Sequence, residues 1–369
     1  MTKEMEFNNK VVTFGEIMGR LSPPDYQRFE QVAPGPWDMT FGGAESSVAA
    51  SVARFGGTAE FVTALPTHAI ADACVRQLRS LDIQTEHILR VPEGRMGLYF
   101  LERGANQRAS QVIYDRAHSA ISEVSADAFD WPEIFKGASW FHTTGITLAL
   151  SEGAAEAACR AAEAAQKAGL TVSVDLNFRA KLWKWRDGVS PVELAREVMP
   201  QLLQYVDVVV GNEEDADKTL GIQAEDTDVD SGQLNIGAFA SVAKEIMSRF
   251  PKVGTVATTL RESISASHNN WGAILSARGE EPVLAPMKDG VYQPYEIRSI
   301  VDRVGGGDAF AGALIFALNS GEFECGQDAL NFAAAASCLA HSVTGDFNRI
   351  TRAEAEGLIK GGGSGRVVR

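Results

Sequence analysis

The chain has 369 residues, of which 45% are hydrophobic and 22% charged, an ordinary composition for a globular protein with a large core. Its formal net charge is −14 and no basic patch is evident, which argues against nucleic acid and anionic membranes as partners. No apolar run reaches the length of a membrane span, and the first ten residues are too polar and acidic for a signal peptide.

The first third of the chain mixes strand and helix patterns with irregular stretches. The run 11–15 predicts a first strand, 16–31 is irregular, and 32–39, which carries two prolines, is at most an edge strand. A strand is predicted over 59–65, between helices over 46–55 and 69–81.

Two strands over 96–102 and 111–116 are joined by a turn that contains Gly104 and Asn106. This hairpin interrupts the alternation of strands and helices. We therefore expect it to stand off the main sheet.

Regular alternation follows, and two Ser/Thr-x-x-Glu capping boxes, at Ser190 and Thr351, mark helix starts. The acidic segment 226–232 is predicted to be a surface loop. The pattern predicts strands over 140–145, 171–177, 206–210 and 253–260, edge strands over 273–277 and 283–286, and helices over 151–168, 190–204, 236–250, 309–318 and 327–341. The fold class is therefore α/β, with a mostly parallel sheet covered by helices on both faces, and ligands are expected at the carboxyl ends of the strands.

Three glycines, Gly305, Gly306 and Gly307, run directly into Asp308 and the apolar helix that follows it. Bare N–H groups at a helix start suit an anion, and a carboxylate beside that anion suits a base that deprotonates a hydroxyl attacking a phosphate. The alternative is a glycine-rich turn in which Asp308 caps the helix. There is no Walker pattern and no GxGxxG, so the ordinary nucleotide loops are excluded.

This Asp-x-x-Gly-x-Gly-Asp-Ala-Phe run, with Gly42-Gly43-Ala44-Glu45 near the N-terminus, resembles the ribokinase-like (PfkB) family of sugar kinases over nearly the whole chain. The resemblance implies a ribokinase-like three-layer sandwich with a mostly parallel central sheet and a small β-strand lid. It implies that Asp308 is the general base and that the N–H groups from Gly305 to Asp308 form an anion hole. The family usually has alanine at Gly306, a difference from which we expect little change in function, and asparagine at Ser47.

The segment from Asp175 to Trp183 has the pattern D-x-N-x-R-x-x-L-W, which resembles the 2-keto-3-deoxygluconate kinases of this family. In a net-acidic protein, an arginine at a strand end is expected to bind an anion. By the resemblance, Arg179 holds the substrate's carboxylate. The same resemblance assigns to the substrate site the residues Gly42, Gly43, Tyr99, Tyr114, Arg116 and Asp346. A helix-entry turn for the glycines, core packing for Tyr99 and a turn cap for Asp346 remain open alternatives.

The nucleotide and metal contacts are implied by the resemblance alone. Asn212-Glu213-Glu214-Asp215 resembles the family's N-x-x-E motif, with Asn212 near the phosphates and Asp215 near Mg²⁺, although an acidic helix start explains the same residues. Arg261 stands where the family has a glycine-containing turn and is expected to reach the phosphates of ATP. Asn331 is expected near the adenine.

The predicted reaction is ATP- and Mg²⁺-dependent phosphorylation of 2-keto-3-deoxy-D-gluconate to its 6-phosphate. The alternatives are a kinase for another sugar or sugar acid, such as fructose or 2-keto-3-deoxygalactonate, and a non-catalytic sugar-acid sensor of the same fold. We expect a single kinase domain over 1–360, with lid segments near 17–39 and 95–118, and a flexible tail over 361–369. Four scattered cysteines without a CxxC motif predict reduced thiols and a cytoplasmic location, and apolar lid edges predict a homo-oligomer.

Overall fold

The computed structural model describes residues 9–223 and 236–361, and it is built around one large sheet. The strands run in the order β15-β14-β13-β12-β11-β10-β1-β4-β6, and β18 also pairs with β14. All neighbours from β13 to β6 pair in parallel, whereas β14, β15 and β18 are antiparallel. The strands are β1 Lys10–Phe14, β4 Ala59–Val62, β6 Ile83–Gln84, β10 Ala138–Thr144, β11 Thr171–Asp175, β12 Val208–Gly211, β13 Thr255–Ser265, β14 His268–Ala277, β15 Val283–Ala285 and β18 Tyr295–Ile297.

Helices cover both faces of this sheet because alternate side chains of its strands point to opposite sides. On β12, Val208 and Val210 belong to one buried cluster and Val209 to the other. The first face is covered by α2 Ala44–Arg54, α3 Ala69–Arg79, α11 Gly306–Ser320, α12 Gly326–Ala340 and α13 Arg352–Ile359. The second is covered by α4 Ala120–Glu123, α5 Trp131–Ile134, α6 Gly145–Leu150, α7 Glu152–Lys167, α8 Pro191–Leu203, α9 Glu213–Leu220 and α10 Ile236–Arg249.

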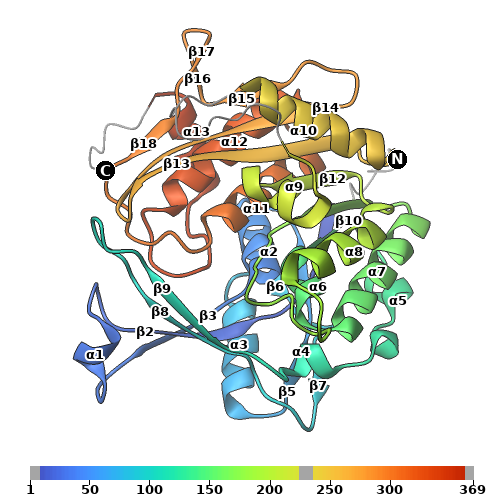
Figure 1. Ribbon diagram of the computed structural model, residues 1–369, viewed down its shortest axis with the longest axis vertical. Coiled ribbons are helices and arrows are strands. Elements are labelled where there is room, and N and C mark those ends of the chain that lie inside the picture. Colours follow the sequence, from blue (N-terminus) through green and yellow to red (C-terminus); the bar gives the residue numbers. More distant parts are fainter. Residues whose placement is uncertain (1–8, 224–235, 362–369) are drawn as a thin grey trace, which may run out of the picture.

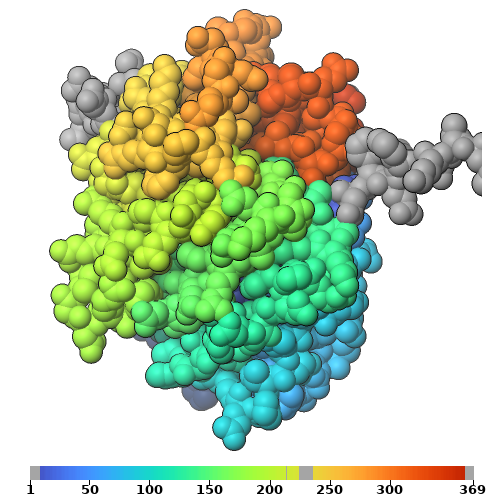
Figure 2. Space-filling view, turned by 90° about the vertical axis from the view of Figure 1, so that its right-hand side faces the viewer, coloured from blue at the N-terminus to red at the C-terminus, as the bar shows by residue number. Residues whose placement is uncertain are grey.

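Figure 2 views the molecule from the second face. The green surface of the middle of the chain lies between the blue N-terminal part and the orange and red C-terminal part. The remaining short elements are β5 Ala64–Pro66, β7 Leu89–Val91, the 3-10 turn Ala126–Ala128, β16 Met287–Lys288 and β17 Val291–Tyr292. No helix in the described ranges is both long and apolar enough to cross a membrane.

A separate four-stranded sheet forms the lid, which projects from the main body in Figure 1. Its strand order is β3-β2-β8-β9, and the short helix α1, Phe29–Val32, lies beside it; the strands are β2 Met18–Ser22, β3 Asp38–Gly42, β8 Leu98–Glu102 and β9 Gln111–Asp115. At the lid tip, Asn106 accepts a hydrogen bond from the Ala266 N–H at 2.7 Å and donates its own N–H to Ser267 Oγ at 2.9 Å. The tip therefore rests on the β13–β14 hairpin.

The register of the lid sheet places one row of side chains on each face. Thr40, Arg20, Tyr99 and Tyr114 are successive partners across the four strands. The next row, on the opposite face, is Met39, Leu21, Phe100 and Ile113. The first row contains the polar and aromatic groups that the site uses, and the second is apolar.

The predicted order of elements is confirmed over the main sheet, and the departures lie mostly in the lid. The stretch 16–31, predicted to be irregular, contains β2, because Arg20 finds buried partners far away in the chain. Beyond Val32, the last residue of α1, the stretch 32–39 is loop up to Asp38, where β3 begins as an edge strand of the lid, in agreement with the prediction. Strand β13 runs five residues beyond its predicted end. The predicted surface loop over 226–232, and all of the predicted tail except Gly361, lie outside the described residues.

Candidate functional site

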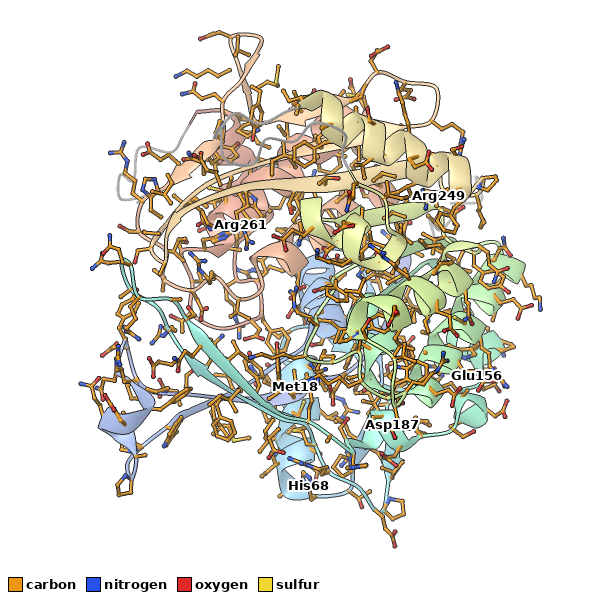
Figure 3. All side chains as sticks on the ribbon, viewed as in Figure 1. Met18, His68, Glu156, Asp187, Arg249 and Arg261 are labelled. Carbon is orange, nitrogen blue, oxygen red and sulfur yellow. The ribbon has the colours of Figure 1, made fainter. Side chains whose placement is uncertain are left out.

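A cavity of about 370 Å³ opens between the lid and the carboxyl ends of β11 and β12. In Figure 3, Met18 on the lid strand β2 lies below it and Arg261 on β13 above it. The cavity is lined by all of the predicted site residues except Gly42 and Asn331: Gly43, Tyr99, Tyr114, Arg116, Arg179, Asn212, Asp215, Arg261, Gly305, Gly306, Gly307, Asp308 and Asp346.

The glycine run forms the N-terminus of α11 at the floor of this cavity. Gly305 has φ +84°, a left-handed conformation, and a Cβ on it would lie 2.4 Å from the Asp346 backbone oxygen. The helix begins at Gly306, and Ser337 Oγ donates to the Gly306 oxygen at 2.6 Å. The first N–H groups of a helix have no partners inside it, so this turn presents donors and partial positive charge to the cavity.

Asp308 lies in the first turn of α11 and faces the cavity. Burial raises the pKa of its carboxyl group to about 7, the negative charges of Asp346 and Glu45 add to this effect, and Arg179 opposes it. A carboxylate with a pKa near neutrality is suited to accept a proton from a hydroxyl group.

Asp346 is the centre of a buried network that joins the lid to the glycine run. The Tyr99 hydroxyl lies 2.7 and 2.6 Å from its two carboxylate oxygens, and Arg20 Nη1 donates to Oδ1 at 2.7 Å. The other end of the Arg20 guanidinium pairs with Asp302, which also accepts the Val304 N–H at 3.1 Å. Burial raises the pKa of Asp346, and Arg20 and Tyr99 counteract this rise.

Arg20 is a member of this network that no sequence signal indicated, and Asp302, the first residue of the glycine-run motif, was given no role by the sequence analysis. They lie 282 positions apart, and Arg20 and Asp346 lie 326 apart, so no local spacing connects them. Burial opposes the charge of Arg20, but Asp346 and Asp302 raise its pKa above the ordinary value. Arg20 therefore keeps its charge and holds both Asp346 and the loop that leads to Gly305.

Glycine is required at positions 42 and 43 because other atoms lie where a Cβ would be, and not because the backbone has a positive φ. A Cβ on Gly42 would lie 1.9 Å from Asp346 Oδ2, and one on Gly43 would lie 2.1 Å from the Glu16 backbone oxygen. Gly42 therefore lies behind Asp346 and outside the cavity lining. The glycine pair allows the chain that enters α2 to pass close to Glu16 and Asp346.

Arg116 lies on the lid side of the cavity and is buried, with only 7% of its surface exposed. Its Nε donates to Glu16 Oε2 at 2.6 Å, and its guanidinium lies 5.4 Å from the centre of the Tyr114 ring. Glu16 Oε1 is buried without a partner among the described residues. Arg179 is exposed to the cavity, and among the described residues its Nη1 donates a hydrogen bond only to the Phe178 oxygen, at 3.1 Å.

Asn212 and Asp215 form a capping box at the start of α9. Asn212 Oδ1 accepts the Asp215 N–H at 3.1 Å, and the two oxygens of Asp215 accept the Phe178 N–H at 3.0 Å and the Asn212 N–H at 3.1 Å. These contacts agree with the alternative that Asn212 and Asp215 cap the acidic start of a helix. The predicted contact of Asp215 with a metal stays a prediction.

Asp175 and Asn177, which only the motif drew attention to, bring more oxygen atoms to this end of the cavity. Burial raises the pKa of Asp175, and the charges of Asp215 and Asp308 raise it further. Asn177 has φ +36°, and its Oδ1 is buried without a partner in the part of the chain that the structure describes. No group of three or more His, Cys, Asp or Glu in the described ranges could hold a metal ion by itself.

Arg261 lines the cavity, together with Arg303 and His341, which the sequence analysis gave no role. The predicted contact of Arg261 with the phosphates of ATP stays a prediction. Asn331 is not brought to the cavity. It lies on α12, where its Oδ1 accepts a hydrogen bond from Gln327 Nε2 at 3.1 Å, one helical turn away.

Comparisons with known proteins agree with this geometry. The family model described as pfkB family carbohydrate kinase matches residues 8–240. The crystal structure of 2-dehydro-3-deoxygluconokinase from Thermotoga maritima is 46% identical, covers 95% of this chain and 99% of its own, and has a TM-score of 0.85. The 2-dehydro-3-deoxygalactonokinase of Haloferax volcanii is 32% identical over 96% of this chain and 98% of its own length.

A putative ribokinase II from E. coli, solved in complex with ATP and Mg²⁺, is 22% identical and covers 95% of this chain and 99% of its own, with a TM-score of 0.73, which shows a common fold. The chain thus has a ribokinase-like fold, with a three-layer body, a β lid and the glycine run before Asp308. Because the family model matches more than half of the sequence and two relatives match nearly all of it, the chain belongs to the pfkB family of carbohydrate kinases.

Proposed function

We propose that the chain is a sugar-acid kinase that transfers the γ-phosphoryl group of ATP to the primary hydroxyl of 2-keto-3-deoxy-D-gluconate, giving the 6-phosphate. The observation that carries the proposal is the position of Asp308. Its carboxyl group, with a pKa of about 7, lies in the first turn of a helix that presents N–H donors to the same cavity. The name of the Thermotoga maritima relative, whose 2-dehydro-3-deoxygluconate is the same sugar acid, supports the choice of substrate.

In this proposal the substrate lies under the lid with its primary hydroxyl at Asp308. Asp308 accepts the hydroxyl proton as the oxygen attacks phosphorus, and the N–H groups at the start of α11 stabilise the charge on the transferring group. Tyr99 and Arg20 hold the Asp346 carboxylate in place, and Asp346 accepts hydrogen bonds from the substrate's hydroxyls. Arg116 and Arg179 supply the positive charge that a carboxylate requires.

Mg²⁺, when bound with ATP, neutralises charge on the transferring phosphate. The residues at the β11 end of the cavity fit it, because Asn177 Oδ1 is a buried oxygen without a partner in the described chain and the Asp175 carboxylate lies nearby. Mg²⁺ retains several waters in most protein sites, so one or two side-chain oxygens with phosphate oxygens are sufficient. Asp215, already occupied by two N–H groups, would then position this end of the cavity rather than bind the ion directly.

The second candidate is the C4 epimer, 2-keto-3-deoxy-D-galactonate. It is favoured by the Haloferax volcanii relative, which matches almost the full length of both chains. The two sugar acids share the carboxylate, the keto group and the primary hydroxyl, so the same base and the same arginines would serve both. They differ only in the direction of one hydroxyl.

The proposal is tested by an ADP-release assay with ATP, Mg²⁺ and a panel of both epimers, fructose and gluconate. A kcat/KM for one epimer that exceeds the value for fructose by at least tenfold supports a sugar-acid kinase, and the ratio between epimers selects the substrate. Equal values for fructose and the keto acids would remove the role given to the carboxylate. Binding of the keto acid without ADP release would favour a sensor.

Two further points extend the proposal to the whole chain. We propose that 1–360 act as one catalytic domain with the lid, and that a second copy of the chain covers the lid's outer row. In that row Ile113 and Met39 are 53% and 43% exposed, and Trp37 packs edge-on against Phe100 at 6.0 Å. Apolar area of this kind is typical of an interface.

A further inference from the structure

The two arginines on the lid side of the cavity are held differently. Arg179 is exposed to the cavity and, among the described residues, donates one hydrogen bond, to the Phe178 oxygen. Arg116 is buried and pairs with Glu16, which is itself only 3% exposed and lines the same cavity. A carboxylate beside a substrate-binding arginine weakens its attraction for an acid. The pairing must therefore serve another purpose.

The Glu16 carboxylate engages one edge of the Arg116 guanidinium. Nε donates to Oε2 at 2.6 Å, and Nη2 forms an ion pair with the same oxygen. The guanidinium also lies over the Tyr114 ring, 5.4 Å from its centre. Nη1 makes no hydrogen bond to any residue that the structure describes, and it is not fully buried. Glu16 thus fixes the orientation of the guanidinium and leaves Nη1 as the donor that is free for a ligand.

The glycines around Glu16 leave the space that its side chain needs. Its backbone oxygen lies 2.1 Å from the position of a Cβ on Gly43, and its Oε1 lies 2.7 Å from the position of a Cβ on Gly97. Oε1 is buried and has no partner within the described ranges. The Glu16 side chain is therefore held by Arg116 alone, in a space that two missing side chains keep open.

Glu16 and Arg116 meet where the lid joins the main body, although they lie 100 positions apart in the chain. Glu16 lies between β1 and β2, and Arg116 directly follows β9. A second pair beside them, Arg95 with Asp115, lies at the surface, and neither of its residues lines the cavity. The two pairs have the same chemistry, but only the buried pair is in a position to act on a ligand in the cavity.

We infer that Glu16 is a positioning residue for the sugar acid, which holds the Arg116 guanidinium so that its free Nη1 meets the substrate. The inference rests on the proposed function, in which Arg116 and Arg179 bind the substrate's carboxylate. A long side chain loses conformational freedom when a ligand fixes it, and a guanidinium that Glu16 already holds loses less. The negative charge of Glu16 opposes binding of the acid, so its benefit lies in orientation and not in attraction.

Calorimetric titration of the full chain with 2-keto-3-deoxy-D-gluconate, without ATP, tests this role. In Glu16→Leu we expect the acid to bind at least about tenfold more weakly, because the guanidinium loses the contact that orients it. The amide oxygen of Glu16→Gln still accepts the Nε hydrogen bond, so this variant should bind the acid as tightly as wild type or more tightly, since a repelling charge is gone. Asp115→Asn is the matched control, because it removes a carboxylate from the surface pair with Arg95 and should leave the affinity within about twofold of wild type.

A double-mutant cycle separates positioning from a direct contact of Glu16 with the substrate. Arg116→Met combined with Glu16→Leu replaces the buried pair by apolar side chains, a change that proteins often tolerate better than the loss of one partner. In the Arg116→Met background, Glu16→Leu should change the affinity for the acid by no more than about twofold, because the residue that it positions is absent.

Three results would overturn the inference: unchanged affinity in Glu16→Leu, an equal loss in Glu16→Gln and Glu16→Leu, or the same loss with and without Arg116. If the acid binds but wild type releases no ADP, the proposed function fails and the titrations still decide the role of Glu16. If wild type releases ADP and Glu16→Leu binds the acid normally, only the role of Glu16 fails. If wild type does not bind the acid, both fail.

Discussion

At the scale of single residues, Asp308 has the clearest expected behaviour. Asp308→Asn removes the proton acceptor but keeps the shape, so we expect kcat to fall by about 10²- to 10⁴-fold with little change in sugar-acid affinity. A steady-state assay combined with titration of the sugar acid measures both quantities. Loss of binding equal to the loss of kcat would assign Asp308 to binding rather than catalysis.

The same substitution is expected to stabilise the protein at alkaline pH. The folded-state pKa of Asp308 is about 7, above the usual 3.8, so this carboxyl group holds its proton more tightly in the folded protein than in the unfolded chain. Its favourable contribution to the free energy of unfolding is therefore fully present below pH 3.8 and is lost as the pH rises through 7. At pH 8, Asp308→Asn should therefore raise the unfolding free energy by roughly 1–3 kcal/mol, a range reduced for the part of the side chain that faces the open cavity. Denaturant unfolding at pH 8 checks this value, with the exposed Asp187→Asn as control.

The pH dependence of turnover follows from the same carboxyl group. A base acts only when ionised, so log kcat/KM should rise with a slope near one up to about pH 7 and then level off. The profile is measured on the preferred sugar acid between pH 5 and 9. A flat profile across this range would show that Asp308 does not carry the rate-determining proton transfer.

Arg20 should be critical for stability although it does not line the cavity. Arg20→Met leaves Asp302 and Asp346 buried without their cation, which we expect to lower the unfolding free energy by about 3–5 kcal/mol. Arg95→Met is the matched control, because Arg95 pairs with Asp115 at the surface, where solvent screens the pair and its contribution to stability should be small. Chemical denaturation of both variants gives the comparison, and similar losses would argue against the buried network.

At the scale of elements, the start of α11 leaves little room for a side chain at Gly306, the position where the family usually has alanine. A Cβ at Gly306 would lie 2.8 Å from His341 Cε1, within a packed wall. Gly306→Ala should therefore cost about 1–3 kcal/mol of stability through overpacking. At Gly307 a Cβ meets no atom within 4 Å, so Gly307→Ala should unfold like wild type. Thermal unfolding of the two variants measures the difference, and equal melting temperatures would show that His341 yields without cost.

Elements with local signals were predictable, and elements held by distant contacts were not. The Ser190 capping box, with Glu193 returning to the Ser190 N–H at 3.0 Å, starts α8 where the sequence predicted. Strand β2 has no such signal, because Arg20 interrupts its apolar pattern and is buried only through carboxylates hundreds of residues away. Secondary-structure propensity depends on the residues close to a position in the sequence. The formation of β2 depends instead on the distant carboxylates that pair with the Arg20 guanidinium.

The site divides in the same way. Asp308 and Arg179 were predictable because each belongs to a short motif at a sheet edge. Arg303 and His341 were not, since a lone arginine or histidine has no spacing to distinguish it. Both line the same cavity, Arg303 from the loop before α11 and His341 from the end of α12. The position of Asn331, one turn from Gln327 and outside the cavity, likewise depends on how α12 is rotated.

At the scale of the whole molecule, the apolar outer row of the lid is expected to hold two copies together. Ile113→Glu places a charge at the β9 end of this row, on its most exposed side chain, and should shift the protein toward the monomer, as measured by light scattering after gel filtration. Ile70→Glu on α3, where the side chain is 48% exposed and is not part of the lid sheet, is the control and should leave the assembly unchanged. A wild-type monomer at micromolar concentration would contradict the proposed assembly.

The lid is attached unequally at its two ends, and this decides how the enzyme must open. At its root Arg20 holds two buried carboxylates, whereas at its tip Asn106 makes two hydrogen bonds to the β13–β14 hairpin, each contributing about 1 kcal/mol. The lid sheet should therefore rotate about its root, and its tip should separate from the main body first. The entrance to the cavity then lies beside the β13–β14 hairpin, and the sugar acid enters past Asn106 rather than past Arg20.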